Sequence, residues 1–334
     1  MSDARFLLVR LGSLGDIVHA LPATSALRDR FPDARIDWLV EARWRRLLEG
    51  NPDLNEVITL DRGSLATIGK TAVALRAKKY TCAIDFQGLY KSSLAAFASR
   101  APKRIGFRSS YAREGLASMF YTDTFNPVGA HKVDHNLTLA RGAGAVDAPA
   151  RFPVAITSDD EATTERELAK HNLREFFVLN PGGGWQSKCW PAERYGSLSD
   201  KLQQRYGWRS VVTYGPGEDD LAKAVLDASV GEKPAALPLA LGPLMALLRC
   251  AKLMISADTG PLHLAAAIGT PVVGLYGPTD PARNGPYGQI DAVIRNARVS
   301  ETTYRRGVSY SPSMISITVE QVLQAVDRRL RRGS

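Results

Sequence analysis

Short apolar runs alternate with longer segments of helical period along the first half of the chain. Runs of this kind predict buried strands, and the segments between them predict helices. Strands that alternate with helices are typical of a parallel sheet covered by helices on both faces. The expected strands are residues 5–9, 35–40, 56–60, 81–86 and 104–107, and the expected helices lie near 22–30, 40–48, 65–78, 89–98, 111–119 and 133–142.

The pattern restarts after a proline-containing stretch at residues 142–156, which we interpret as the approach to a linker. Further strands that run into glycine turns follow, and the final segment carries apolar residues at helical spacing. The sequence therefore predicts an α/β protein of two doubly wound, Rossmann-like domains, residues 1–165 and 172–315. Ligands of such sheets bind beyond the carboxyl ends of the strands, so two domains facing each other would form a cleft suited to two substrates.

Composition narrows the class of protein. A chain of 334 residues is long enough for two domains. No segment approaches the roughly 18 uninterrupted apolar residues of a membrane span, and the N-terminal segment is not a signal peptide, so we expect a cytoplasmic protein. The three cysteines are scattered along the chain, which argues against a disulfide framework and against a zinc site.

The positive charge is concentrated in the first half of the chain. The net charge is +9, of which residues 1–150, with 21 Lys/Arg and 15 Asp/Glu, contribute +6. Such a bias favours an anionic partner, such as a nucleic acid, a membrane surface or a phosphorylated substrate, although a solvated basic surface has the same composition. No run of Lys and Arg is interleaved with aromatic residues, so a nucleic-acid partner is not expected.

The turn at residues 256–269 is the most specific of the glycine turns. Asp258 or Thr259 can cap a helix there, and Pro261 suits its first turn. The free backbone N–H groups of Thr259 and Gly260 would then form a phosphate or diphosphate site with the helix dipole, and His263 could add a donor. The alternative from the capping signal alone is an ordinary capped helix with a buried histidine.

Two further turns of the second half carry charged residues. Three glycines at 182–184 precede Lys188, and the arrangement matches neither the GxxxxGK[ST] phosphate loop nor GxGxxG. Lys188 could neutralise a leaving diphosphate as a point charge. Glu218 follows a strand and could accept hydrogen bonds from ribose hydroxyls, and Asp219 is the alternative. The competing interpretations are a surface lysine and acidic residues that suit a helix N-terminus.

The polar turns of the first half are mostly cationic or neutral. We expect side chains of these turns to bind an anionic substrate, although each could equally be an ordinary polar or charged surface residue. They are Gln87, Lys91, Arg108, Arg113 and His131, and Lys132 follows His131. The opening turn, "VRLGSLGDIVHALPA" at 9–23, also resembles a phosphate loop. Asp16 at its tip would repel a phosphate, however, so this turn needs another explanation.

Three of these motifs together resemble a known family. "RLGSLGDIVHALPA", "NPGGGWQSKCWP" and "SADTGPLHLAAAIGTPVVGLYGPTDP" are similar to the lipopolysaccharide-core heptosyltransferases of glycosyltransferase family 9. The resemblance runs from about residue 5 to 290, and "DFQGLYKSS" and "YAREGLASMFY" are most similar to the heptosyltransferase I subgroup. It implies the GT-B fold, with a C-terminal helix, 317–332, that packs back on the first domain.

The resemblance also implies an activity. It is an inverting, metal-independent transfer of heptose from ADP-L-glycero-β-D-manno-heptose to the Kdo sugars of lipid A, without a cofactor. The enzyme would be a monomer at the cytoplasmic face of the inner membrane. The matched positions are Asp16 and Lys188 as catalytic residues; Gly183, Glu218, Asp258, Thr259, Gly260 and His263 on the donor side; and, more loosely, Ser13, Gln87, Lys91, Arg108, Arg113 and His131 on the acceptor side.

A role as general base would then explain why the first turn carries the carboxylate of Asp16. In this arrangement the turn faces the acceptor hydroxyl, and the nucleotide binds to the second half of the chain. Other readings remain open at this point. They are a heptosyltransferase II or III, a protein heptosyltransferase, a nucleotide-sugar epimerase and a nucleotide-binding protein without turnover. A dehydrogenase is the least favoured, because no GxGxxG motif opens either half.

Overall fold

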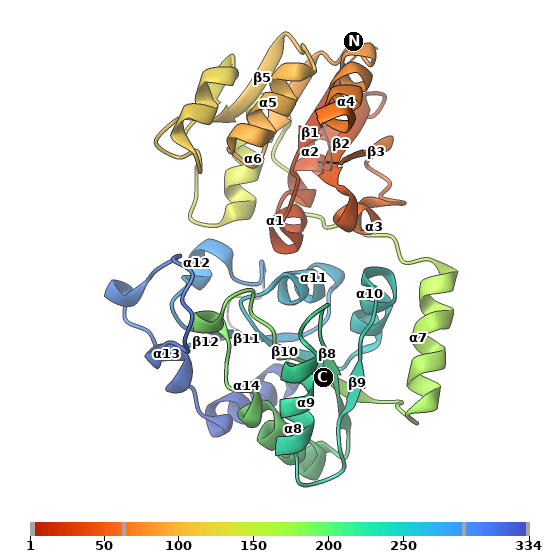
Figure 1. Ribbon diagram of the computed structural model, residues 1–334, viewed down its shortest axis with the longest axis vertical. Coiled ribbons are helices and arrows are strands. Elements are labelled where there is room, and N and C mark those ends of the chain that lie inside the picture. Colours follow the sequence, from red (N-terminus) through yellow and green to blue (C-terminus); the bar gives the residue numbers. More distant parts are fainter. Residues whose placement is uncertain (1–3, 62–64, 289–291, 332–334) are drawn as a thin grey trace. The chain divides into compact units, whose positions relative to one another are not determined.

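The structure, a computed structural model, describes residues 4–61, 65–288 and 292–331 (Figure 1). The chain divides into two compact units, Met1–Ala155 and Ile156–Ser334.

The described part of the first unit contains a sheet of six parallel strands in the order β3-β2-β1-β4-β5-β6. Its central strands are buried on both faces, which explains why their sequences are continuous apolar runs rather than alternating ones. The strands are β1 (Arg5–Val9), β2 (Arg35–Glu41), β3 (Glu56–Leu60), β4 (Cys82–Asp85), β5 (Lys103–Phe107) and β6 (Asp123–Phe125).

Helices connect these strands, as the alternating pattern predicted. One expected helix, 111–119, is instead the short 3₁₀ helix η2 (Gly115–Phe120), and the short strand β6 that follows it was not expected. Both elements are too short to carry a clear hydrophobic period. The other helical elements are α1 (Leu14–Val18), α2 (Leu21–Arg30), η1 (Ala42–Trp44), α3 (Arg45–Leu48), α4 (Leu65–Ala77), α5 (Tyr90–Ala98) and α6 (Lys132–Gly142).

The described part of the second unit repeats the architecture with six parallel strands in the order β12-β11-β10-β7-β8-β9. The strands are β7 (Phe176–Asn180), β8 (Arg209–Thr213), β9 (Ala235–Leu237), β10 (Leu253–Ala257), β11 (Val272–Tyr276) and β12 (Val293–Arg295). The helical elements are α7 (Ser158–Lys170), η3 (Gln186–Lys188), α8 (Ala192–Tyr206), α9 (Asp219–Ala228), α10 (Leu241–Cys250), α11 (Gly260–Ile268), α12 (Pro281–Asn284), η5 (Val299–Glu301), α13 (Pro312–Ile315) and α14 (Val319–Arg331).

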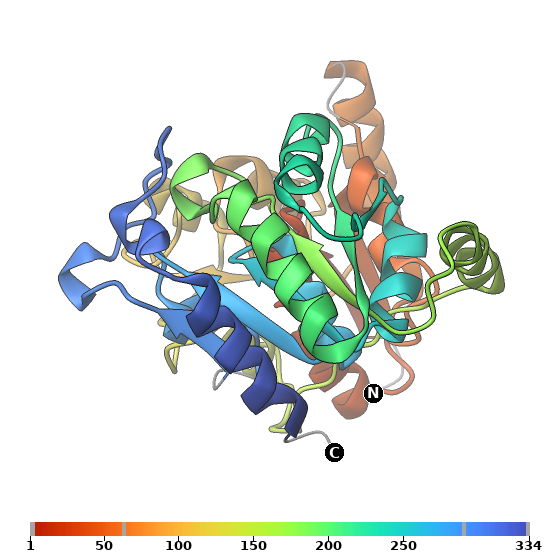
Figure 2. The same cartoon turned by 90° about the horizontal axis from the view of Figure 1, so that it is seen from below.

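The C-terminal helix α14, which the resemblance placed against the first domain, packs on the second unit. Its apolar face, with Val322 and Val326, joins the core formed by α8 and the sheet, and Figure 2 shows α14 and α8 side by side. The indole of Trp190 also donates a hydrogen bond to the carbonyl of Ile317, 2.9 Å away. Helix α7 belongs to the second unit as well, so the first unit ends before residue 165.

Both sheets have the same topology, in which the chain reverses its direction of winding between two central strands. The reversal lies between β1 and β4 in the first unit and between β7 and β10 in the second. Ligands of doubly wound sheets bind where the carboxyl ends of such strands diverge. The turns after β1 and β4, and those after β7 and β10, are therefore the places to look for functional side chains.

Candidate active site

Asp16 lies directly beyond β1, on the short helix α1. The hydroxyl of Ser13, at the N-cap position, donates a hydrogen bond to Asp16 Oδ2 at 2.9 Å. Gly12 allows the turn to lie against Trp44, because a Cβ atom there would come within 2.9 Å of the indole nitrogen. This turn brings Ser13 and Asp16 together beyond the carboxyl end of β1.

Two cations bind the carboxylate of Asp16. Arg10 Nη2 lies 2.7 Å from Oδ2, and Lys132 Nζ lies 2.9 Å from Oδ1. The Asp16 side chain is only 14% exposed. Burial by itself would raise the pKa of Asp16, but the charges of Arg10 and Lys132 outweigh it and hold the pKa well below its usual value. Asp16 is therefore ionised at neutral pH, as a group that accepts a proton must be.

Helix α6 brings Lys132 to this carboxylate. The ring of His131 caps the helix, because its Nδ1 accepts a hydrogen bond from the backbone N–H of Val133 at 3.1 Å. The side-chain amide of Asn136 donates to the carbonyl of His19, which joins α6 to the end of α1. The structure thus gives His131, expected on the acceptor side, a buried capping contact one residue before Lys132.

The turn after β4 is joined to the turn after β1. The side-chain oxygen of Gln87 accepts a hydrogen bond from the backbone N–H of Leu11 at 2.9 Å, and Arg10 donates to the carbonyl of Phe86. Buried Asp85 shapes this turn, since its carboxylate accepts hydrogen bonds from the backbone of Gln87 and from the hydroxyl of Tyr121 at 2.8 and 2.7 Å. Gln87 thus lies beside the Asp16 turn, with its oxygen already bonded.

The remaining cations expected on the acceptor side have other surroundings in the structure. Lys91 Nζ is 3.3 Å from Glu41 Oε1 at the end of β2. Arg108 and Arg113 are exposed on the segment that follows β5. Within the described ranges no ion pair joins either arginine to Asp16, so the carboxylate is held by Arg10 and Lys132 instead.

The pH dependence of activity tests the role of Lys132. In Lys132→Met, loss of the positive charge is expected to raise the pKa of Asp16, because burial then opposes ionisation with less compensation. The acid limb of the kcat/KM profile should move to higher pH by about one unit. The control Lys70→Met removes an exposed charge on α4 and should leave the profile in place. An unmoved acid limb in Lys132→Met would show that Asp16 does not set it.

In the second unit, Asp258 is the centre of a buried polar cluster beyond β10. Its Oδ2 lies 3.0 Å from Lys188 Nζ and accepts a hydrogen bond from the amide of Asn284 at 3.0 Å. His263 Nε2 lies 3.2 Å from Oδ1. Burial alone would raise the pKa of Asp258, but the hydrogen bond from His263 and the charge of Lys188 lower it. Because an ionised carboxylate only accepts, the ring of His263 is the donor.

These contacts give Asp258 a different role from the direct donor binding that the resemblance implied. A carboxylate repels phosphate, and this one faces Lys188 and His263, so it orients those two groups. Thr259, in turn, is the N-cap of α11, and its hydroxyl accepts a hydrogen bond from the backbone N–H of Leu262 at 3.3 Å. The N–H of Gly260 in the first turn has no acceptor within the helix, and this leaves an anion-binding end beside the cluster.

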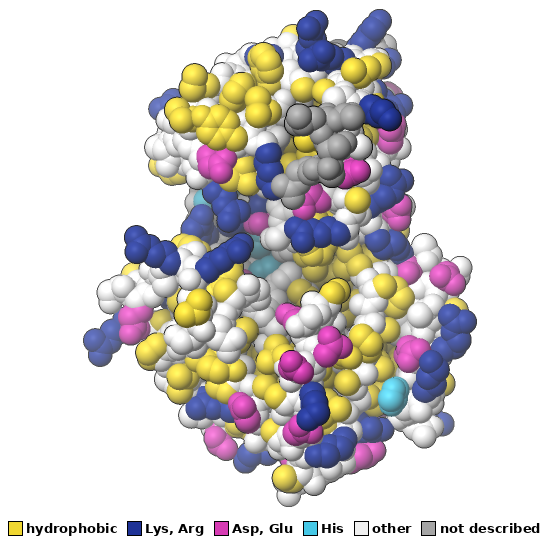
Figure 3. Space-filling model, viewed as in Figure 1, with side chains coloured by type: hydrophobic (Ala, Val, Ile, Leu, Met, Phe, Trp, Pro, Cys, Tyr) yellow, Lys and Arg dark blue, Asp and Glu magenta, His cyan; other side chains and the backbone are white. Residues whose placement is uncertain are grey.

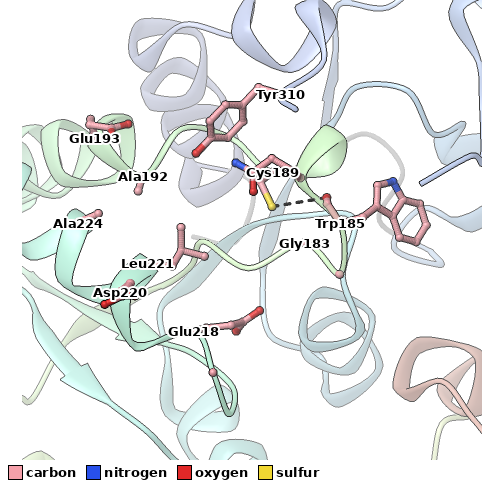
Figure 4. A pocket seen from close by; sticks show the side chains of 13 residues that line it. Gly183, Trp185, Cys189, Ala192, Glu193, Glu218, Asp220, Leu221, Ala224 and Tyr310 are labelled. Carbon is pink, nitrogen blue, oxygen red and sulfur yellow. Dashed lines mark hydrogen bonds between the residues drawn. The ribbon is translucent and has the colours of Figure 1, made fainter. Parts of the chain in front are cut away.

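A cavity of about 500 Å³ opens beside the glycine turn after β7 (Figure 4). Glu218 and Tyr310 lie on opposite sides of it, with Cys189 and Leu221 between them. A volume of this size suits a small-molecule ligand. The residues that line it are Gly183, Gly184, Trp185, Gln186, Cys189, Ala192, Glu193, Gly217, Glu218, Asp220, Leu221, Ala224 and Tyr310.

Glu218, rather than Asp219, lines this cavity. Its carboxylate accepts a hydrogen bond from the backbone N–H of Gly215 at 2.7 Å and lies over Gly182, where a Cβ atom would come within 2.6 Å of it. The same glycine turn leads into η3, which carries Lys188 with its ammonium 4.3 Å from the centre of the Trp185 ring. The turn therefore links the cavity to the buried cation.

Sequence reasoning missed several members of both sites. The sequence analysis assigned no function to Arg10, which ends an apolar run. Its position directly after β1 was the one feature of the sequence that could have identified it as a site residue. Asn284 comes from α12, a four-residue helix without a recognisable motif. Cys189 and Tyr310 line the cavity, and Tyr310 lies far along the chain from the glycine turn. Their placement depends on packing, which local patterns do not encode.

Two doubly wound units of the same topology, with polar turns at both reversal points, have the architecture of the GT-B fold. A sequence model of glycosyltransferase family 9 (heptosyltransferase) matches residues 68–312, and the chain belongs to this family. The fold and family predicted from the sequence are thus confirmed.

Known relatives cover most of the chain. Lipopolysaccharide heptosyltransferase 1 of Pseudomonas aeruginosa is 29% identical over 92% of this chain and 88% of its own. Lipopolysaccharide heptosyltransferase 3 of Escherichia coli is 29% identical over 80% of each chain. The structure of the E. coli heptosyltransferase WaaC with ADP has 25% identity and a TM-score of 0.74, covering 98% of both chains.

Proposed function

We propose that this enzyme transfers L-glycero-D-manno-heptose from ADP-heptose to the Kdo region of lipid A, in assembly of the lipopolysaccharide inner core. The observation that carries the proposal is the cavity that Glu218 lines, joined by one glycine turn to Lys188. This arrangement suits a nucleoside diphosphate, with a carboxylate for ribose hydroxyls and a cation for phosphates. A relative with similar structure was solved with ADP, which supports the same ligand here.

On the donor side, the proposed reaction needs positive charge where the ADP leaving group becomes more negative. Lys188 and the N-terminus of α11 would supply it, and Asp258 would hold Lys188 and His263 in place. No divalent metal takes part in this proposal, so transfer should persist in the presence of a chelator.

On the acceptor side, Asp16 would take the proton from the attacking hydroxyl as the new glycosidic bond forms. A single displacement inverts the configuration at the sugar carbon and needs only this one carboxylate. The low pKa of Asp16 makes it a weak base while both cations hold it. An anionic acceptor that draws Lys132 away would raise that pKa, so that binding of the correct substrate strengthens the base.

Relatives named heptosyltransferase 1 and heptosyltransferase 3 are both 29% identical to this chain. The alternative is therefore a heptosyltransferase II or III, or transfer to a protein, from the same donor. Among the described residues no helix is long and apolar enough to cross a membrane, and we propose peripheral action at the cytoplasmic face of the inner membrane.

One assay separates these acceptors. The enzyme is incubated with ADP-heptose and, in parallel, with Kdo-bearing lipid A, heptosylated lipid A or a protein acceptor, and products are identified by mass. We expect one heptose to be added to the Kdo-bearing acceptor, with ADP released in equal amount. Transfer only to the heptosylated lipid would assign type II or III. Conversion of the donor without any acceptor would contradict the proposal.

A further inference from the structure

Helices α5 and η2 present an apolar surface on the first unit. Their outward side chains are large and exposed, from 39% for Tyr90 to 75% for Met119. Figure 3 shows hydrophobic side chains gathered over this part of the unit. We define the α5–η2 patch as the five exposed residues Tyr90, Leu94, Phe97, Leu116 and Met119.

The patch is continuous rather than a set of isolated residues. The ring of Phe120 in η2 lies 6.2 Å from the ring of Tyr90 and 5.6 Å from that of Phe97, both in α5. Spacing by three places Leu94 with Phe97, and Leu116 with Met119, on the same side of each helix. Single exposed apolar residues are ordinary, but a continuous apolar surface marks an interaction site.

Positively charged residues are concentrated in the segment that carries the patch. Residues 90–120 contain six Lys/Arg and one Asp/Glu, so this segment carries +5 of the net charge of +9. Arg100 follows α5 and Arg113 precedes η2, and both are exposed. Arg76, from α4, donates a hydrogen bond to the carbonyl of Ala98 at the end of α5. Apolar side chains with arginines beside them match a membrane surface, in which negatively charged phosphates lie above an apolar layer.

We propose that the α5–η2 patch docks on a bilayer that contains anionic lipids. The apolar side chains would enter the boundary between headgroups and acyl chains, while the arginines pair with lipid phosphates. The guanidinium of Arg104 lies 5.5 Å from the centre of the Phe97 ring, so a cation stands beside the apolar side chains of the patch. This inference deepens the proposed function. It rests on the proposed function in one respect, namely that a lipid acceptor makes membrane docking useful.

The patch is built on the same turn as the Asp16 site. The backbone N–H of Tyr90 donates to Glu114, and the N–H of Glu114 donates to the carbonyl of Gly88, so α5 and η2 are both fixed to the turn after β4. That turn is bonded to the Asp16 turn through Gln87. Docking by this surface would therefore hold the first-unit site at the membrane from which a lipid-anchored sugar projects.

Cosedimentation with vesicles of phosphatidylethanolamine and phosphatidylglycerol, without donor or acceptor, tests the proposal. We expect the wild-type protein to bind these vesicles, and to bind phosphatidylcholine vesicles more weakly. Leu116→Ser with Met119→Ser should lower the partition coefficient by about tenfold. The matched control is Val308→Ser, because Val308 is 97% exposed but lies in the second unit, and it should bind as wild type does.

The charge is tested separately. Arg100→Ser and Arg113→Ser should each weaken binding to the anionic vesicles by about fivefold. The matched control Arg174→Ser removes an exposed arginine of the second unit and should have no effect. Thermal unfolding of every variant should match the wild type, because the substituted side chains are exposed.

Two results would overturn the proposal. One is equal vesicle binding by the wild type and the Leu116→Ser/Met119→Ser variant. The other is a wild-type dimer in sedimentation analysis that this variant converts to monomer, which would assign the patch to a second copy of the chain. The proposed function fails independently, since a protein that binds vesicles through the patch but transfers no heptose to detergent-dispersed acceptor would contradict only the reaction.

Discussion

Asp16→Asn is expected to lower kcat for heptose transfer by between about a hundredfold and ten-thousandfold. The amide has nearly the shape of the carboxylate but cannot accept the proton of the attacking hydroxyl. Affinity for ADP, measured by calorimetry, should change little, because the donor cavity and Lys188 lie in the second unit. The loss should therefore appear in kcat with donor affinity intact.

The structure requires one control for this variant. Arg10 is 8% exposed, and neutralising Asp16 leaves its charge uncompensated, which costs stability. Thermal unfolding must show that Asp16→Asn is still folded at the assay temperature. Asp147→Asn removes a carboxylate of the same unit that is 81% exposed and should retain full activity. An active, folded Asp16→Asn enzyme would exclude Asp16 as the base.

Lys188→Met should cause the second largest loss, about a hundredfold to a thousandfold in kcat/KM. Methionine fills much of the space of the lysine stem but cannot stabilise the charge that develops on the leaving diphosphate. Steady-state kinetics with ADP-heptose measure this loss, and calorimetry with ADP shows how much of it is donor binding. Lys223→Met, at an exposed position of α9, is the control and should behave as wild type.

A double variant separates chemistry from folding. Lys188→Met leaves the buried Asp258 carboxylate with only the donors His263 and Asn284 among the three that bind it now. Adding Asp258→Asn removes that uncompensated charge and should recover stability without recovering transfer. Recovery of transfer in the double variant would mean that Lys188 acts only by neutralising Asp258.

The sequence was informative wherever a local pattern determines the structure. The expected strands at 5–9 and 56–60 match β1 and β3 residue for residue, because short runs rich in Phe, Leu, Val and Ile between polar turns favour strands. The helix at 133–142 begins one residue earlier in the structure, where His131 acts as the cap. By contrast, η2 and β6 are short and have no period of their own.

The candidate site likewise contains some residues that the sequence predicts and others that it does not. The turns with Asp16, Lys188, Glu218 and Asp258 could be found in the sequence, since each follows a strand and carries a distinctive set of glycine, proline and charged residues. The partners of these residues could not be found. Which cation would reach Asp16 depended on how α6 packs against α2 and the end of α1, and no pattern within these segments specifies that.

The sequence by itself determined the alternation of strands and helices, the two glycine-rich halves and the family. Only the tertiary structure decided that Lys132 binds Asp16 across 116 positions of the chain, that Lys188 binds Asp258 across 70, and that α14 packs on the second unit. Hydrophobic period and turn chemistry act over a few residues, whereas these pairings follow from how strands and helices pack. The strand order places the ends of β7 and β10 side by side, so that Lys188 meets Asp258, and the packing of α6 against α2 brings Lys132 to Asp16.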